Sequence, residues 1–229
     1  MGGKGSRIAL GLAVALTAFG AMITSANAAA IILPSPDCCT FEAGPFEQAQ
    51  GEIAILDNSA TTAPHDVRST QNGPDGGFLF QSAAIAGGVT APVVGSQYLT
   101  AGTYPFYCTI HGPSMSGELT VNSSGTAVKR PAVKVSILRQ RLKRVRKSGI
   151  KVRLKATAAA KGVTVIARKG KKVLGTKRKL NFKAGQARIV TIRLTKAGRK
   201  AIRRGKAVKV SVQAKVPYGK PSKSTRKLR

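Results

Sequence analysis

The chain has 229 residues, of which 39 are basic and eight are acidic, and its formal net charge at pH 7 is +31. This length is sufficient for two ordinary domains. The chain contains only two histidines, three cysteines and three methionines, which excludes oxidases that hold several copper ions through many imidazoles.

The N-terminus has the composition of a secretory signal peptide. Lys4 and Arg7 precede an apolar stretch over residues 8–23, and residues 26–28 offer the small side chains that a signal peptidase needs. We therefore expect residues 1–28 to be removed and the protein to be exported, to an extracellular, cell-envelope or periplasmic location. An uncleaved anchor is the alternative, but the stretch is short for a membrane span. No second such stretch follows, so we expect no transmembrane span in the mature chain.

The charges divide the mature chain into two parts. Residues 29–124 carry eight acids and a single base, Arg68, whereas residues 125–229 carry 36 bases and no acid. The boundary falls in a polar stretch of linker composition, residues 122–126. We predict an N-terminal domain over residues 29–121, a linker over 122–132, a basic domain over 133–216 and a disordered basic tail over 217–229.

Short strand signals separated by Gly, Pro, Asn and Asp dominate the N-terminal domain. The predicted strands are residues 52–56, 78–80, 103–108 and 118–121. This pattern favours an all-β fold, either a small antiparallel sandwich or a barrel. In the third strand Tyr104, Phe106 and Cys108 share one face, so the thiol is expected on the core side at the end of the strand.

Four side chains of this domain form a ligand set for a soft metal. Cys108, His111 and Met115 lie close together in sequence, and His65 follows the loop of residues 58–64. A thiolate, two imidazoles and a thioether together select copper. We therefore predict one copper ion bound by His65, Cys108, His111 and Met115, with the last two on one tight loop.

The same residues resemble a known family. His65-Asp66-Val67, and the later motif G-T-Y-P-F-Y-C-x-x-H-x-x-x-M-x-G over residues 102–117, look like those of cupredoxins of the plastocyanin, amicyanin and pseudoazurin kind. The resemblance covers about residues 40–122 and implies a β-sandwich with one type 1 (blue) copper on the four ligands named above. Two departures stand out. Asp66 replaces a frequent Asn, and the gap between His111 and Met115 lies between those of amicyanin-like and plastocyanin-like proteins.

The resemblance also implies a function. A copper site of this kind passes single electrons with little rearrangement, so we expect an electron carrier without catalytic residues rather than an enzyme. In the family the second histidine reaches the surface through an apolar patch, which implies that a redox partner protein docks near His111. The expected rim is Pro64, Gly112 and Pro113, and an apolar rim suits brief docking. Copper storage or delivery is the alternative function for the same ligands.

Other interpretations of these side chains fit less well. Zinc prefers four strong ligands, and methionine is a poor one. A thiol protease needs an activated cysteine, and Cys108 has no helix N-terminus beside it. The pairing of Cys38 and Cys39 stays open, because a vicinal disulfide, a bridge to another molecule and two free thiols all fit the sequence.

Alternation of apolar and polar residues predicts strands in the basic domain. The predicted strands are residues 133–137, 150–156, 163–167, 188–194 and 209–215. Thr195 is expected to cap a short helix that runs through Ala197, Ala201 and Ile202 and ends at Gly205. The strand spacing indicates an immunoglobulin-like β-sandwich. Residues 194–200, followed by a Val-rich strand, weakly resemble bacterial immunoglobulin-like modules of secreted surface proteins.

A domain with 36 bases and no acid repels itself unless a polyanion neutralises it. For an exported protein the expected partner is an anionic cell-envelope polymer or lipid surface, or the acidic half of this chain or of a neighbour. Nucleic acid is the weaker expectation, because only Phe182 and Tyr218 could stack on bases. The sequence therefore predicts a carrier attached to an anionic surface. The alternatives are adhesion as the main role and a charged surface that merely keeps the domain soluble.

Overall fold

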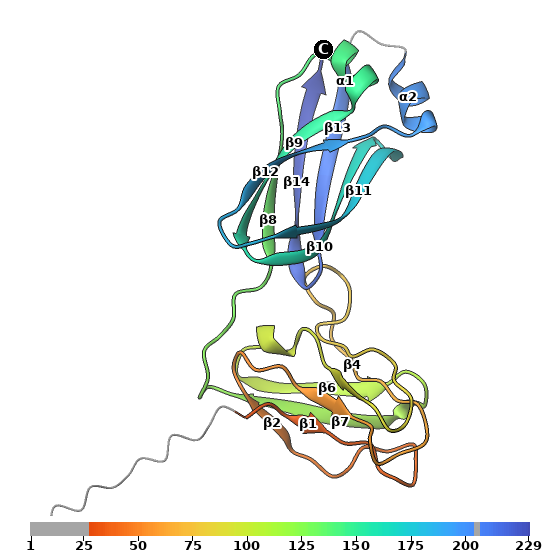
Figure 1. Ribbon diagram of the computed structural model, residues 1–229, viewed down its shortest axis with the longest axis vertical. Coiled ribbons are helices and arrows are strands. Elements are labelled where there is room, and N and C mark those ends of the chain that lie inside the picture. The colour runs from red at the N-terminus through yellow and green to blue at the C-terminus, as the bar shows by residue number, and fades with distance from the viewer. Residues whose placement is uncertain (1–27, 204–206) are drawn as a thin grey trace, which may run out of the picture.

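The computed structural model describes residues 28–203 and 207–229, which form two all-β lobes (Figure 1). Buried apolar residues fall into two clusters, one between Ala30 and Val121 and the other between Val133 and Leu228. The predicted signal peptide lies outside the described residues, apart from Ala28. In the described part of the chain, no helix has the length and apolar character needed to cross a membrane.

The N-terminal lobe packs two sheets against one another around the first cluster. The smaller sheet has the order β1 (Ile31–Ile32), β3 (Ile55–Asp57), β5 (Thr90–Pro92). The larger has the order β2 (Phe46–Ala49), β7 (Gly112–Asn122), β6 (Gly102–Cys108), β4 (Arg68–Ser69). The β1–β3 and β2–β7 pairs are parallel, and the other pairs are antiparallel. A 3-10 turn, Ser96–Tyr98, follows β5.

An aromatic cluster sets the position of β6 in this core. The ring of Phe106 meets Phe41 edge-on, with centroids 5.0 Å apart, and lies 6.0 Å from Phe46 and 6.5 Å from Phe80. Gly117 on β7 makes room for this ring, because a Cβ added there would lie 2.7 Å from Cζ of Phe106. The packing holds the end of β6, and with it Cys108, in the interior.

Two of the four strand predictions in this lobe need correction. The predicted strands 103–108 and 118–121 are confirmed within β6 and β7, but 52–56 shortens to β3. The prediction at 78–80 is wrong, since Phe78 makes only a single bridge, to Asn72. The amides of Leu79 and Phe80 donate to Oγ of Ser69, at 2.8 and 3.3 Å, and the Leu79 amide also donates to the Gln71 carbonyl at 3.0 Å. A side-chain hydroxyl therefore shares the backbone hydrogen bonds of this segment with single carbonyls, and no regular strand forms.

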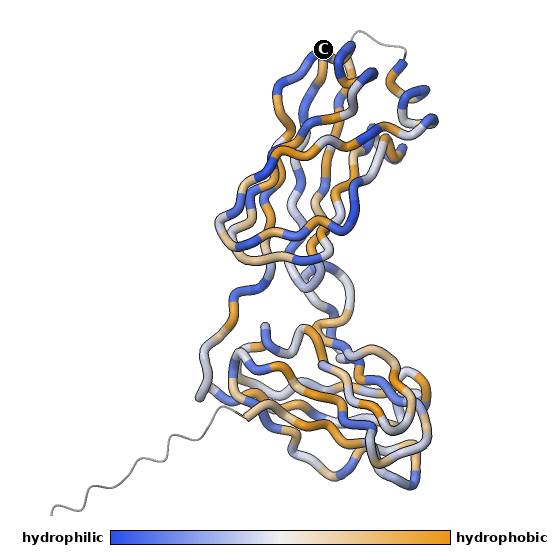
Figure 2. Tube along the Cα trace, viewed as in Figure 1, coloured by the Kyte–Doolittle hydropathy of each residue, from blue (hydrophilic) through white to orange (hydrophobic). Residues whose placement is uncertain are grey.

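The C-terminal lobe is an antiparallel sandwich of three plus four strands, the immunoglobulin-like arrangement predicted from the strand spacing. One sheet has the order β12 (Ala187–Ile192), β9 (Ile150–Ala158), β8 (Ala132–Ile137). The other has the order β11 (Lys172–Phe182), β10 (Ala160–Lys169), β13 (Val208–Val216), β14 (Gly219–Leu228). Buried apolar and exposed polar residues alternate along β9 and β13 (Figure 2), so the bases of these strands lie on the outside of the sandwich.

Two short helices lie at the end of this lobe that is remote from the N-terminal lobe (Figure 1): α1 (Leu142–Ser148) and α2 (Lys196–Arg203). The predicted cap of α2 is confirmed, because Oγ1 of Thr195 accepts a hydrogen bond from the amide of Gly198 at 2.9 Å. Gly205, where the helix was expected to end, lies outside the described residues. Only Leu142 and Val145 of α1 are buried, and the sequence did not predict this helix.

The prediction of a disordered tail over 217–229 is wrong. Most of it forms β14, which pairs with β13 along its length. Ser222 Oγ donates to the Val133 carbonyl at 2.6 Å, and Leu228 is buried. The scarcity of apolar residues indicated disorder. An edge strand, however, is held by backbone pairing on one side, and a polar, lysine-rich sequence is typical of such edges.

The turn between β13 and β14 contacts the N-terminal lobe. The amide of Tyr218 donates to Oδ2 of Asp75 at 2.9 Å, and Nε2 of Gln81 donates to the Tyr218 hydroxyl at 3.3 Å. The Tyr218 ring lies 6.2 Å from that of Tyr98. Burial of this ring raises the pKa of the Tyr218 hydroxyl. A small polar contact therefore joins the lobes, in addition to residues 123–131, which run from β7 to β8.

Candidate metal centre

Two predicted ligands, Cys108 and His111, contact each other at one end of the N-terminal sandwich, and the ring of a third, His65, lies beside that of His111. Cys108 ends β6, and His111 lies in the turn that leads into β7. The Sγ atom of Cys108 lies 3.6 Å from Nδ1 of His111. The His65 ring comes from the segment before β4, and its centroid is 4.8 Å from that of His111.

Met115 occupies a strand rather than a loop. β7 begins at Gly112, which pairs with Cys108 across the turn, next to a bulge between Tyr107 and Cys108. The expectation of one tight loop from His111 to Met115 is therefore wrong, because the turn already closes at Gly112. Met115 is fully buried and belongs to the same apolar cluster as Cys108.

A buried hydrogen-bond network sets the tautomer of His65. The amide nitrogen of Asn58 donates to the carbonyls of Ala63 at 2.9 Å and Ala86 at 3.0 Å, which identifies the other amide atom as the oxygen. That oxygen lies 2.8 Å from Nδ1 of His65. Since an amide oxygen only accepts, Nδ1 carries the ring proton and Nε2 carries the lone pair.

The Nε2 atom of His65 is the kind of atom that a metal satisfies. It is buried and has no hydrogen-bond partner among the described residues, and such orphaned atoms are uncommon in folded proteins. Burial lowers the pKa of His65, and the nearby His111 lowers it further. The ring is therefore neutral at physiological pH, with a lone pair free to bind a cation.

Asp66 ties the His65 segment to the Cys108 turn. Its buried carboxylate accepts hydrogen bonds from the amide and the hydroxyl of Thr109, at 2.7 and 2.6 Å. Nε of Arg68 pairs with the same carboxylate at 3.0 Å. These hydrogen bonds lie next to two predicted ligands, because Asp66 directly follows His65 and Thr109 directly follows Cys108.

Two further thiols reach this end of the sandwich, which the sequence did not indicate. Sγ of Cys38 lies 3.8 Å from Nε2 of His111. The ligand atoms of Cys38, Cys39 and His111 all lie within 4.8 Å of one another. All three cysteines of the chain are free. A side-chain hydrogen bond with Cys39, burial, and the neighbouring thiols Cys39 and Cys108 raise the pKa of Cys38.

The surface around His111 is partly apolar. His111 and Gly112 are half-buried, and Pro64 and Pro113 are exposed. Ile110, which the sequence analysis did not place in the rim, is 45% exposed. The imidazole therefore reaches the surface of the lobe beside an exposed isoleucine.

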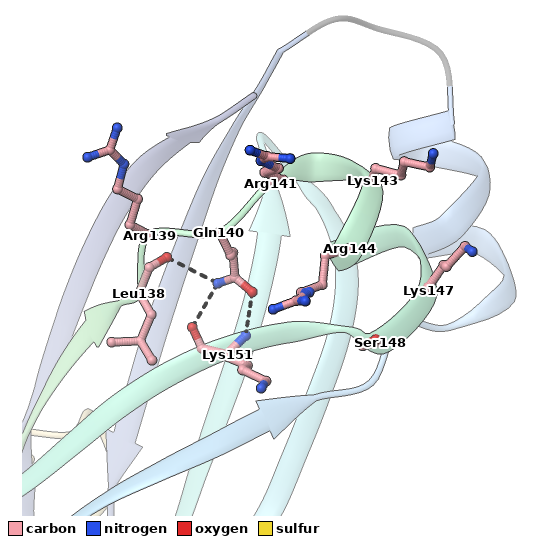
Figure 3. A pocket seen from close by; sticks show the side chains of 9 residues that line it. All are labelled: Leu138, Arg139, Gln140, Arg141, Lys143, Arg144, Lys147, Ser148 and Lys151. Atoms are coloured by element: carbon pink, nitrogen blue, oxygen red, sulfur yellow. Dashed lines mark hydrogen bonds between the residues drawn. The ribbon is translucent and has the colours of Figure 1, made fainter.

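A second feature lies at the far end of the C-terminal lobe. A pocket of about 580 Å³ opens between α1 and the start of β9. Gln140 shapes its wall, since its amide nitrogen donates to the Leu138 and Lys151 carbonyls and its oxygen accepts from the Lys151 amide (Figure 3). Six bases line the pocket: Arg139, Arg141, Lys143, Arg144, Lys147 and Lys151.

Comparison with known proteins adds little to this geometry. No protein-family model matches the chain. No curated protein matches it. Among solved structures it is similar to a tetra-tandem repeat in the extending region of a large adhesion protein, with 12% sequence identity and a TM-score of 0.31. The match covers 77% of this chain and 48% of that one, so this chain spans about half of its length. A likeness at that score supports no conclusion about function.

Proposed function

We propose that the N-terminal sandwich is a cupredoxin-like electron carrier that holds one type 1 copper ion. The observation that carries the proposal is that the buried thiol of Cys108 contacts the imidazole of His111, and that the ring of His65 lies beside the ring of His111. The buried thioether of Met115 belongs to the same core. Thiolate, two imidazoles and a weak thioether form the donor set that accommodates both oxidation states of copper.

The surrounding residues suit a centre that changes little when one electron passes. Asn58 holds the proton of His65 on Nδ1, so Nε2 is ready to bind before any metal arrives. Asp66 holds the turn that carries Cys108 and His111. Ligands held by hydrogen bonds behind them bind a metal more firmly and in a defined orientation. In this proposal the half-buried His111 ring is where an electron leaves for a docked redox partner.

The decisive experiment is the spectrum of the copper(II)-loaded protein. We expect intense visible thiolate-to-copper absorption and the narrow copper hyperfine splitting of a blue site in paramagnetic resonance. Cys108→Ser should abolish both signals. Cys39→Ser, which removes an exposed thiol, should retain them. A pale wild-type protein with ordinary copper(II) spectra would overturn the proposal.

We also propose that the basic lobe attaches the protein to an anionic surface through the pocket at its far end. Six bases line that pocket, and the chain has no acid beyond Glu118 to compensate them. Helix α1, which borders the pocket, lies at the opposite end of its lobe from the turn between β13 and β14 that contacts the N-terminal lobe (Figure 1). Attachment there leaves the His111 surface free for a redox partner. A phosphate-bearing envelope polymer or lipid headgroup is the matching chemistry.

Binding to vesicles of phosphatidylglycerol tests the attachment. Each base near an anionic surface contributes about 1 kcal/mol, so Arg144→Gln with Lys147→Gln should weaken binding about thirtyfold. The matched control is Lys161→Gln with Lys183→Gln, which removes two exposed bases outside the pocket, and it should retain most of the affinity. Vesicle binding that is unchanged by Arg144→Gln with Lys147→Gln, or unchanged at high salt, would contradict the attachment.

A further inference from the structure

Cys38 and Cys39 form a second cluster of soft ligands on the outer side of His111. One loop carries both thiols, and its base is closed by hydrogen bonds from Ser35 to the Thr40 carbonyl at 2.9 Å and from Glu42 to the Leu33 carbonyl at 2.9 Å. Both cysteines have positive φ, 69° and 71°. Residues other than glycine adopt this backbone conformation infrequently. The loop therefore holds two adjacent thiols at one place on the lobe.

The donor atoms of this cluster suit a monovalent soft ion. The two Sγ atoms and an imidazole nitrogen lie within 4.8 Å of one another, which brings three donors within reach of one cation. Two thiolates and one imidazole select copper(I), whereas structural zinc takes four strong ligands. Cys39 is exposed and Cys38 is half-buried, so an ion can reach this cluster from solvent.

His111 belongs to both clusters, through different nitrogens. Its Nδ1 atom lies 3.6 Å from Sγ of Cys108, and its Nε2 atom lies 3.8 Å from Sγ of Cys38. A neutral imidazole has one lone pair, so it can donate through only one nitrogen at a time. The outer and inner positions therefore share one ligand and are occupied in turn.

We propose that Cys38, Cys39 and Nε2 of His111 form a loading site that captures copper(I) and passes it to the inner centre. On capture the two thiols lose their protons to solvent as two sulfur–copper bonds form, and no electron is transferred. On passage the two thiols recover two protons, one released by Cys108 and one taken from solvent, and the His111 proton moves from Nδ1 to Nε2. Only the second step rests on the proposed function, because the outer ligands bind without the inner ones.

Copper(I) binding by Cys108→Ser tests the outer site by itself. Under anaerobic reducing conditions, with bathocuproine disulfonate as competitor, this variant should bind one copper(I) and show ultraviolet thiolate-to-copper(I) absorption. Adding Cys38→Ser and Cys39→Ser should lower its affinity at least about tenfold and remove the absorption. Thr40→Ala, an exposed position of the same loop, is the matched control and should leave both unchanged. Equal binding with and without the two thiols would overturn the proposal.

Alkylation gives a readout that does not depend on how the triple variant folds. In Cys108→Ser, copper(I) should protect Cys38 and Cys39 from iodoacetamide, as followed by mass spectrometry of the modified peptide. Unprotected thiols on a copper-loaded protein would also overturn the proposal.

The rate of copper loading in proteins that retain Cys108 distinguishes this proposal from the blue-copper proposal. After addition of copper(I) and then oxidant, the Cys38→Ser, Cys39→Ser double variant should reach the same final blue absorbance as wild type but at least about tenfold more slowly. Equal rates would contradict the loading role of Cys38 and Cys39 without contradicting the proposed blue copper centre. If neither protein turns blue, the proposed function fails, and copper(I) binding by Cys108→Ser still decides whether the outer site exists.

Discussion

Asp66 and Thr109 are joined by two hydrogen bonds, one from the amide and one from the hydroxyl, although they stand 43 residues apart. Thr109→Val removes the hydroxyl bond to a buried carboxylate and should lower the free energy of unfolding by about 1–3 kcal/mol. Thr109→Ser keeps the hydroxyl and should lie within about 0.5 kcal/mol of wild type. Urea unfolding of the metal-free protein measures both. Equal stability of the two variants would show that the hydroxyl bond contributes nothing.

The stability of the metal-free protein should depend on the ionisation of His65. Because burial lowers its pKa, the folded protein binds this proton less readily than the unfolded chain. The contribution of the neutral ring is complete above the unfolded pKa of about 6.5 and is lost as pH falls below that value. The free energy of unfolding should therefore decrease from pH 7 to pH 5, and His65→Gln should flatten this part of the profile. Direct titration of the His65 ring by NMR should give a midpoint below about 6.5; a midpoint above it would reverse the sign.

Gly117→Ala should disturb the core beside the candidate metal centre. The new Cβ would lie 2.7 Å from Cζ of the buried Phe106, and crowding of this kind costs about 1–3 kcal/mol. Gly77→Ala is the matched control, since the atoms nearest to its Cβ would belong to the Asp75 side chain, at ordinary contact distances from 3.7 Å. Thermal unfolding followed by circular dichroism compares them. Two equal melting temperatures would show that β7 shifts to accept the methyl group.

The last strand should be necessary for the stability of the C-terminal sandwich. Leu228→Ala removes a buried side chain at the end of β14 and should cost about 2–3 kcal/mol. Lys227→Ala changes an exposed neighbour and should stay within about 0.5 kcal/mol of wild type. Denaturant unfolding of the two variants tests β14 directly. A disordered tail would make them indistinguishable.

Periodicity in the sequence predicted the strands that have one buried and one exposed face. The alternation from Ile150 to Ala156 falls within β9, and that from Lys209 to Lys215 falls within β13. Periodicity missed β14, because its pairing with β13 depends on backbone hydrogen bonds that leave no apolar pattern. It also assigned residues 78–80 to a strand, where the hydroxyl of Ser69 accepts from the amides of Leu79 and Phe80 and no regular strand forms.

The candidate site was predictable where its residues lie close in sequence. Cys108 and His111 are three positions apart, and a strand followed by a turn brings them together. The approach of Cys38 to His111 was not predictable, because it spans 73 positions and depends on how the loop of residues 35–40 folds over the lobe. No spacing rule connects residues so distant, and only the tertiary packing places them together.

The hydrogen bonds of Asn58 have a consequence for how the protein exists without an ion. Turning the His65 ring over would replace the Nδ1 hydrogen bond to the Asn58 oxygen with a contact to the ring carbon Cδ2, and rotating the Asn58 amide would turn its NH2 group away from the carbonyls that hold it. The empty and filled forms of the lobe should therefore share one geometry at this residue. Crystals of the protein without metal should accept a soaked ion without cracking.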